Sequence, residues 1–225
     1  MKKYFVGATV IAALLIGAVY IESNSQPERS YYQDNDFKKM KTDATRIMLT
    51  NYPTHQQETE YSCGNAAALT VLNYFGNYDY DEKKLIELMN TKPTSGTSIV
   101  GMVKFFNGIG WKVRSSLSEP PIVNESDFKN FVAKNLSDGN PILVENVEYG
   151  GHWRVIIGLD TMGTENLYDD VLIFADPYDT SDHNQDGYTV GSLDRFFSMW
   201  FDHKVLPENE RNQPWIIVDG GKNIG

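Results

Sequence analysis

Cys63 is the only cysteine of the chain, and the residues around it could make it a nucleophile. It follows the polar stretch 57–62, and the apolar residues after Ala66 recur at helical intervals. We therefore expect a helix whose first turn carries Cys63. Unpaired backbone N–H groups and the positive end of the helix dipole favour thiolate over thiol at such a position. The competing interpretation is a small, buried apolar residue, which isolated cysteines often are.

Three other side chains could complete a site around this thiol. Gln57 lies six residues before Cys63, and its amide can donate a hydrogen bond to an oxyanion beside the sulfur. His152 follows a glycine pair, where an imidazole can accept the thiol proton and later protonate a leaving amine. Asp176 ends an apolar stretch and could fix the tautomer of His152. Taken singly, His152 could be a polar residue at a strand end and Asp176 the start of a turn.

The elements that must position these side chains come in the order of helices first and strands second. After the helix that begins at Cys63, helical periodicity predicts three more helices, over 80–90, 99–108 and 128–136. Stretches rich in β-branched and aromatic residues predict strands over 111–115, 142–147, 152–160, 171–175 and 215–218. This order is typical of an α+β domain in which helices pack on an antiparallel β-sheet.

Three segments of the chain resemble those of bacteriocin-processing, double-glycine leader peptidases and their standalone relatives, which are papain-like cysteine peptidases. They are Gln57…Cys63-Gly64-x-Ala66, Gly151-His152-Trp153 and Ala175-Asp176-Pro177. The resemblance covers about 57–178 and implies a papain-like fold. It also implies Cys63 as nucleophile, His152 as general base and acid, Asp176 as orienting residue, and Gln57 as oxyanion donor together with the backbone N–H of Cys63. The implied reaction is peptide-bond hydrolysis through an acyl-enzyme, with no metal or other cofactor.

The N-terminal residues 1–26 have the form of an export signal. Lys2 and Lys3 precede an apolar run over 5–21, and a polar stretch follows it. The run could be a cleaved signal peptide or an uncleaved membrane anchor, and either would leave the remainder outside, periplasmic or extracellular. We expect residues 27–50 to form a tether and a short helix, and 51–225 to form the peptidase-like domain. In an oxidising compartment, an unpaired cysteine favours a working thiol.

Composition limits the partners of the protein. The chain has 225 residues, a formal net charge of -10 and a pI near 4.8. An acidic surface repels the phosphate backbone, so a nucleic-acid partner is not expected. A peptide or protein substrate remains the expected partner.

A second, weaker pattern lies near the C-terminal third. Asp182, Asn184 and Asp186 alternate as in the first half of a calcium-binding loop, with Gly187 at the sixth position. Leu193 stands where such a loop carries a glutamate, so a polar surface turn is the other interpretation. The spacing of His55, His183 and His203 predicts no metal site, and we expect these rings to face solvent. The aromatic run over 196–201 is expected to pack in the core.

The leading hypothesis is an exported cysteine peptidase or related amide-bond hydrolase. Two alternatives stay open from the sequence. One is a catalytically inactive, peptidase-like binding or assembly module at the cell surface, and the other is a transpeptidase that passes the acyl group to an amine.

Overall fold

The computed structural model describes residues 35–180 and 184–221. The expected export segment, 1–26, lies outside these residues. The described residues all belong to one unit of the chain, Asp34–Gly225. Within this part, no helix is both long and apolar enough to span a bilayer.

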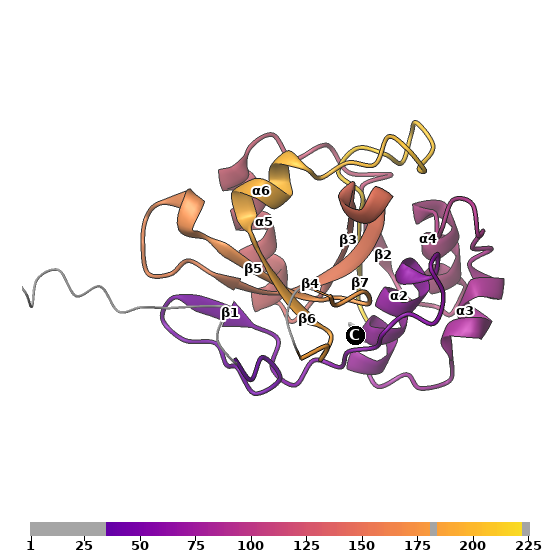
Figure 1. Cartoon of the computed structure of the whole chain (residues 1–225), viewed down its shortest axis with the longest axis horizontal. Helices are drawn as coiled ribbons and strands as arrows, with labels where there is room; N and C mark the ends of the chain where they lie inside the picture. Colours follow the sequence, from indigo (N-terminus) through magenta and orange to yellow (C-terminus); the bar gives the residue numbers. More distant parts are fainter. Residues whose placement is uncertain (1–34, 181–183, 222–225) are drawn as a thin grey trace, which may run out of the picture. The chain divides into compact units, whose positions relative to one another are not determined.

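Seven strands form one antiparallel sheet in the order β2-β7-β3-β4-β5-β6, with β1 also paired to β4 (Figure 1). Their bounds are β1 (Arg46–Met48), β2 (Val113–Ser115), β3 (Ile142–Asn146), β4 (His152–Asp160), β5 (Val171–Ala175), β6 (Tyr188–Ser192) and β7 (Trp215–Val218). β4 organises the sheet, because its first half pairs with β3 and its last residues pair with β1, while β5 lies along the other edge. Every residue of β4 is buried.

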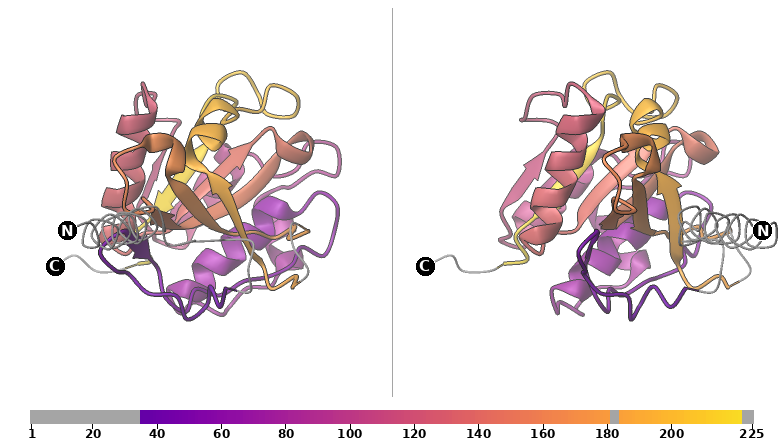
Figure 2. Two further views of the ribbon diagram at one scale, coloured as in Figure 1. Left: turned by 60° about the vertical axis from the view of Figure 1, so that its left-hand side comes forward. Right: turned by 90° about the vertical axis from the view of Figure 1, so that its left-hand side faces the viewer.

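The helices gather on two sides of this sheet. They are α2 (Cys63–Tyr74), α3 (Glu82–Leu88), α4 (Ile99–Gly108), α5 (Glu125–Ser137) and α6 (Leu193–Ser198), with single 3₁₀ turns at η1 (Glu148–Gly150) and η2 (Leu167–Asp169). Figure 1 shows α2, α3 and α4 on one side of the strands and α5 and α6 on the other, and Figure 2 shows the same separation from two further directions. The first group contacts the sheet through α2 on β4 and α4 on β2 and β7, and the second mainly through α5 on β4.

The central helix, α2, lies in the interior. All residues from Cys63 to Leu72 are buried, which explains the three consecutive alanines at its centre. Gly64 lies so close to the loop before α4 that a Cβ atom there would be 2.7 Å from the Cβ of Thr97. Small residues thus let α2 approach the sheet and this loop, and the approach fixes the position of Cys63.

The α+β architecture predicted from the sequence is confirmed, and so are most of its elements. The expected helices correspond to α3, α4 and α5, and the expected strands to β2, β3, β4, β5 and β7. The expected aromatic core contact is also present, since Phe128 of α5 packs against Phe196 and Trp200, at 5.8 and 4.8 Å between ring centroids.

One expectation about secondary structure was wrong, and two strands were missed. Among residues 35–50 no helix forms, and Arg46–Met48 instead makes strand β1, opposite Gly158–Asp160. The second strand missed is β6, which follows the calcium-like stretch and pairs along the whole of β5. Both strands depend on hydrogen bonds to partners far away in sequence, which local propensity does not register.

Candidate active site

Cys63 is the first residue of α2, as the sequence predicts. Its side chain is 8% exposed. Among the described residues, no side chain caps the first turn of α2, because the hydroxyl of Ser62 donates to the carbonyl of Thr59. The first N–H groups of a helix have no partner within the helix, so they can stabilise negative charge on a sulfur placed there.

His152 and Asp176 meet because their strands are antiparallel neighbours. His152 is the first residue of β4, and Asp176 directly follows β5. The chain reaches His152 through Tyr149, Gly150 and Gly151, which have positive φ of 54°, 85° and 114°. Nε2 of His152 lies 2.7 Å from Oδ1 of Asp176, within hydrogen-bond distance. The structure therefore brings together two side chains that are 24 residues apart.

Asp176 is buried, and several donors surround it. Its Oδ2 accepts from Oγ1 of Thr189 at 2.9 Å, its Oδ1 accepts from the N–H of Tyr178 at 2.9 Å, and Nη1 of Arg154 lies 3.7 Å from Oδ2. Burial raises the pKa of Asp176, but the hydrogen bond to His152 and the nearby positive charges outweigh it and hold this pKa below its ordinary value. Asp176 is thus a carboxylate in position to orient the imidazole.

His152 is hydrogen-bonded to Asp176, and Cys63 lines the same pocket as its ring. Because Nε2 is engaged by Asp176, Nδ1 is the nitrogen left for the sulfur. Burial alone would lower the pKa of His152. The hydrogen bond to Asp176 and the neighbouring Cys63 outweigh burial and raise this pKa to about 9. At neutral pH the ring is therefore an imidazolium, with a proton on each nitrogen. This positive state stabilises a neighbouring thiolate.

Gln57 lies beside this group. Its backbone N–H donates to the carbonyl of Pro177 at 2.9 Å, which ties it to the residue after Asp176. Its side-chain Nε2 donates to the carbonyl of Thr59 at 2.7 Å. An amide nitrogen carries two N–H groups, so one remains beyond the bond to Thr59, and Gln57 and Cys63 line the same pocket.

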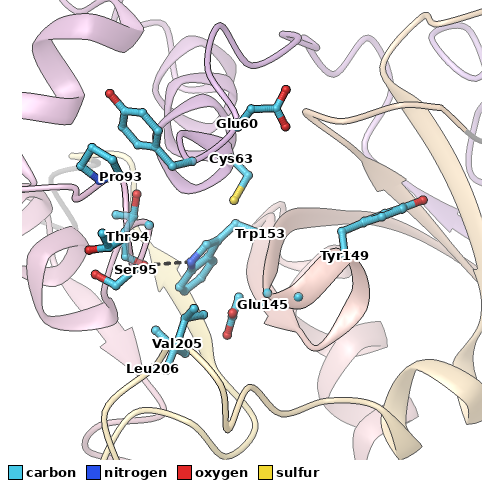
Figure 3. Close-up of a pocket in the computed structure, with 15 residues that line it drawn as sticks. Glu60, Cys63, Pro93, Thr94, Ser95, Glu145, Tyr149, Trp153, Val205 and Leu206 are labelled. Atoms are coloured by element: carbon cyan, nitrogen blue, oxygen red, sulfur yellow. Dashed lines mark hydrogen bonds between the residues drawn. The ribbon is translucent and has the colours of Figure 1, made fainter.

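Two pockets meet at Cys63. The first, of about 270 Å³, is lined by Gln57, Glu60, Cys63, Tyr149, Gly151, His152 and Tyr178. The second, of about 180 Å³, shares Cys63 and Gly151 and extends between the 93–97 loop and Glu145, Trp153, Val205 and Leu206 (Figure 3). The thiol, although mostly buried, is thus accessible from both.

A family model described as the Peptidase_C39 like family matches residues 49–200. The match includes all four predicted site residues and more than half of the chain. The chain belongs to the Peptidase_C39 like family. This confirms the family suggested by the sequence resemblance.

Solved structures agree with the C39-like assignment. The fold is similar to that of the peptidase domain of Streptococcus ComA, described as a bifunctional ABC transporter involved in quorum sensing, with a TM-score of 0.50 and 21% identity over 74% of this chain and 97% of that one. It is also similar to a Bacillus anthracis protein described as a C39-like peptidase, with a TM-score of 0.52 and 12% identity over 77% and 96% of the two chains. No curated protein matches the chain. At such identities the likeness shows the fold, a papain-like arrangement of helices and antiparallel sheet.

Sequence reasoning missed a cluster around Glu82 in this C39-like domain. Glu82 is 1% exposed, and His55 is half-buried rather than solvent-facing, with Nε2 2.8 Å from Oε2 of Glu82. The N–H of Glu58 donates to Oε1 of Glu82 at 2.9 Å. These contacts hold the segment between Gln57 and the helix start. Hydrogen bonding to Glu82 raises the pKa of His55.

The same cluster contains the one set of possible metal ligands among residues 35–180 and 184–221. Single ligand atoms of His55, Glu58 and Glu82 lie within 4.8 Å of one another. His55 and Glu82 already satisfy each other, so we interpret the group as a buried ion pair that braces the loop.

The calcium-like stretch lies partly outside the described residues, because Asp182 is not among them. Asn184 and Asp186 are described. Oδ1 of Asp186 accepts from the N–H of Tyr188 at 3.0 Å, and its carbonyl accepts from Oγ1 of Thr54 at 2.8 Å. These contacts are those of a polar turn that leads into β6, and calcium binding stays a prediction.

A pair of carboxyl groups was not predicted at all. Glu145 in β3 and Asp202 after α6 are both buried and in contact with each other. Burial, followed by the contact with Asp202, raises the pKa of Glu145 to about 11. No local sequence signal marks them, because 57 residues separate the two positions.

Proposed function

We propose that this C39-like protein is an exported cysteine peptidase, or a closely related amide-bond hydrolase, that acts through Cys63, His152, Asp176 and Gln57. The observation that carries the proposal is the 2.7 Å hydrogen bond between Nε2 of His152 and Oδ1 of Asp176, with His152 and Cys63 lining one pocket. A nucleophile, a base and a group that orients the base are the components of acyl transfer by a cysteine enzyme.

The chemistry follows from the positions of the protons. The thiol proton resides on Nδ1 of His152, and the thiolate of Cys63 attacks the carbonyl carbon of the scissile amide. The backbone N–H of Cys63 and the free N–H of Gln57 donate to the resulting oxyanion. The imidazolium then protonates the leaving amine, the C–N bond breaks and a thioester remains. Finally His152 removes a proton from water, which hydrolyses the thioester and releases the thiol.

Asp176 acts on the ring and does not transfer a proton. Its carboxylate accepts the Nε2–H and stabilises the imidazolium, and the donors around Asp176 keep it charged. The chemistry requires no metal ion.

The decisive experiment uses the fact that the chain has a single cysteine. Iodoacetamide should alkylate Cys63 about tenfold faster than glutathione at pH 7, and the ratio should widen at pH 5.5, where a free thiol is almost fully protonated. Intact-mass spectrometry reports the rate. Cys63→Ala should abolish hydrolysis of a fluorogenic peptide pool.

Two results would contradict the peptidase proposal. Equal alkylation of Cys63 and glutathione at both pH values would indicate an ordinary buried thiol. Surface function that survives Cys63→Ala would favour the binding or assembly module. Adducts with an added amine acceptor, formed faster than hydrolysis products, would instead support transpeptidation.

Export is a separate part of the proposal, and the segment 1–26 is its basis. Cell fractionation of the full chain, with N-terminal sequencing of the product, should find the domain outside the cytoplasm, either shortened by a signal peptidase or retained in the membrane through residues 5–21. Full-length protein in the cytosol would contradict export and would leave the chemistry at Cys63 untouched.

A further inference from the structure

The second pocket at Cys63 has an acidic end that the proposed chemistry does not use. Glu145 and Asp202 are 2% and 0% exposed, and Glu145 lines the pocket (Figure 3). Oε2 of Glu145 and Oδ2 of Asp202 receive no hydrogen bond from any group in residues 35–180 and 184–221. Buried carboxyl oxygens normally have donors, and these two oxygens lack one.

The position of the pair is fixed by the surrounding backbone. Oδ1 of Asp202 accepts from the N–H groups of Lys204 and Val205, at 2.8 and 3.1 Å, which leaves Oδ2 for Glu145. A Cβ on Gly151 would collide with Oδ2 of Asp202 and lie 3.2 Å from Oε1 of Glu145. Because Gly151 has no side chain, the carboxyl groups of Glu145 and Asp202 can occupy the space beside it.

No positive side chain neutralises the pair. In the described part of the chain, neither Glu145 nor Asp202 forms an ion pair with a basic residue, and the remaining charged group on the pocket lining is the acidic Glu60. Lys204 ends beside Gly150, but it is exposed and does not line the pocket. Burial and the neighbouring Asp202 raise the pKa of Glu145, so Glu145 holds a proton at neutral pH.

One wall of the pocket is apolar, and the 93–97 loop, with its polar Thr94 and Ser95, forms another. Trp153, Val205 and Leu206 form one side, next to Glu145 (Figure 3). A volume of about 180 Å³ is far larger than a single water requires. A flexible methylene stem with a positive head fits this combination, because the stem covers apolar surface while the head reaches the carboxyl oxygens.

We propose that this pocket is the subsite for a lysine-like or arginine-like side chain of the peptide substrate, whose positive group binds at Glu145, beside Asp202, and displaces the proton of Glu145 to solvent. The proposal rests on the peptidase function and adds the chemical class of one substrate residue. The cation supplies N–H donors to the carboxyl group of Glu145 and balances its charge, as no basic side chain on the pocket lining does.

The experiment measures how fast peptide electrophiles label Cys63. Alanine-based tetrapeptidyl chloromethyl ketones carry lysine, arginine, norleucine or glutamate at each position in turn, and intact-mass spectrometry gives the second-order rate. Norleucine has the stem of lysine without its charge. At one position, the lysine or arginine probe should label about tenfold faster than the norleucine probe, and glutamate should be slowest.

Glu145→Gln tests the origin of that preference. It removes the charge with little change in shape, and it should reduce the preference over norleucine to about twofold or less. Glu165→Gln is the matched control, because Glu165 is exposed and lies on neither pocket. It should keep the full preference. Thermal unfolding of both variants checks that they fold.

The outcomes separate the two proposals. Slow labelling by iodoacetamide, at the rate of glutathione, would contradict the peptidase function itself. Rapid iodoacetamide labelling with equal lysine and norleucine rates at every position would overturn only the subsite. A lysine preference that Glu145→Gln leaves unchanged would also overturn it, since the preference would then arise elsewhere.

Discussion

Two buried acidic groups lie near Cys63, and they differ in what surrounds them. Asp176 has His152, Thr189, Arg154 and a backbone N–H around it, and its pKa is lowered although it is buried. Glu145 has another carboxyl group beside it, and its pKa is raised to about 11. Burial disfavours the charge at both places. The donors decide whether a buried carboxyl group is a fixed negative charge or a group that retains a proton.

The largest difference between the two acidic groups should be catalytic. Asp176→Ala should lower kcat about 10²- to 10³-fold, because His152 loses the acceptor that orients it. Asp176→Asn should recover part of the loss, since an amide oxygen still accepts from Nε2. Single-turnover rates on a fluorogenic peptide measure both. If Asp176→Ala stays within threefold of the unmodified protein, Asp176 does not act on the ring.

The two acidic groups should also affect stability in opposite directions. Asp176→Ala should lower the free energy of unfolding by about 3–5 kcal/mol at pH 7, because it leaves buried partners unpaired. Glu145→Gln should raise it by about 1 kcal/mol or more, the equivalent of one pKa unit.

The gain from Glu145→Gln should depend on pH in a defined way. The pKa of Glu145 is higher in the folded state than in the unfolded state, so the free energy of unfolding falls as pH rises past about 4.3, the unfolded value. Glutamine does not ionise, so the variant lacks this fall. Urea unfolding at pH 5 and pH 8 should therefore show the larger gain at pH 8. A gain that is the same at both pH values, or a loss, would refute the raised pKa of Glu145.

Gly151 lies against Glu145 and Asp202, and a side chain there should disturb them. Gly151→Ala should cost about 2–4 kcal/mol, because alanine is strained at a φ of 114° and its Cβ would collide with Asp202. Gly108→Ala in α4 is the control. A Cβ there meets no atom within 4 Å, and alanine should be neutral or stabilise the helix by up to about 1 kcal/mol. Equal effects in urea unfolding would show that Gly151 is not constrained.

The smallest effect should appear in the pH profile of His152. Its raised pKa predicts that activity falls as pH rises through about 9, where the imidazolium is lost. Among the causes that raise the pKa of His152, the hydrogen bond to Asp176 is the largest. Asp176→Asn should therefore move the alkaline limb of kcat/KM to lower pH by about one unit. Glu165→Gln should leave the limb in place.

Much of this structure could be predicted from local sequence signals. Helix α4 and strands β4, β5 and β7 begin and end where periodicity and turn residues place them. The order of elements and the residue types at positions 57, 63, 152 and 176 were sufficient to predict a Cys, His and carboxylate set. Strands β1 and β6 were missed, because their sequences become strands only against β4 and β5.

The sequence by itself determined that a lone thiol starts a helix, that a histidine begins one strand and that an aspartate ends another. These are local properties of spacing, turn residues and helix termini. Only the tertiary structure decided which acid meets the imidazole, that His55 binds Glu82, and that Glu145 and Asp202 face each other beside the thiol. The reason is physical: the charge state of a buried carboxyl group depends on donors brought to it through space, and no spacing along the chain encodes them.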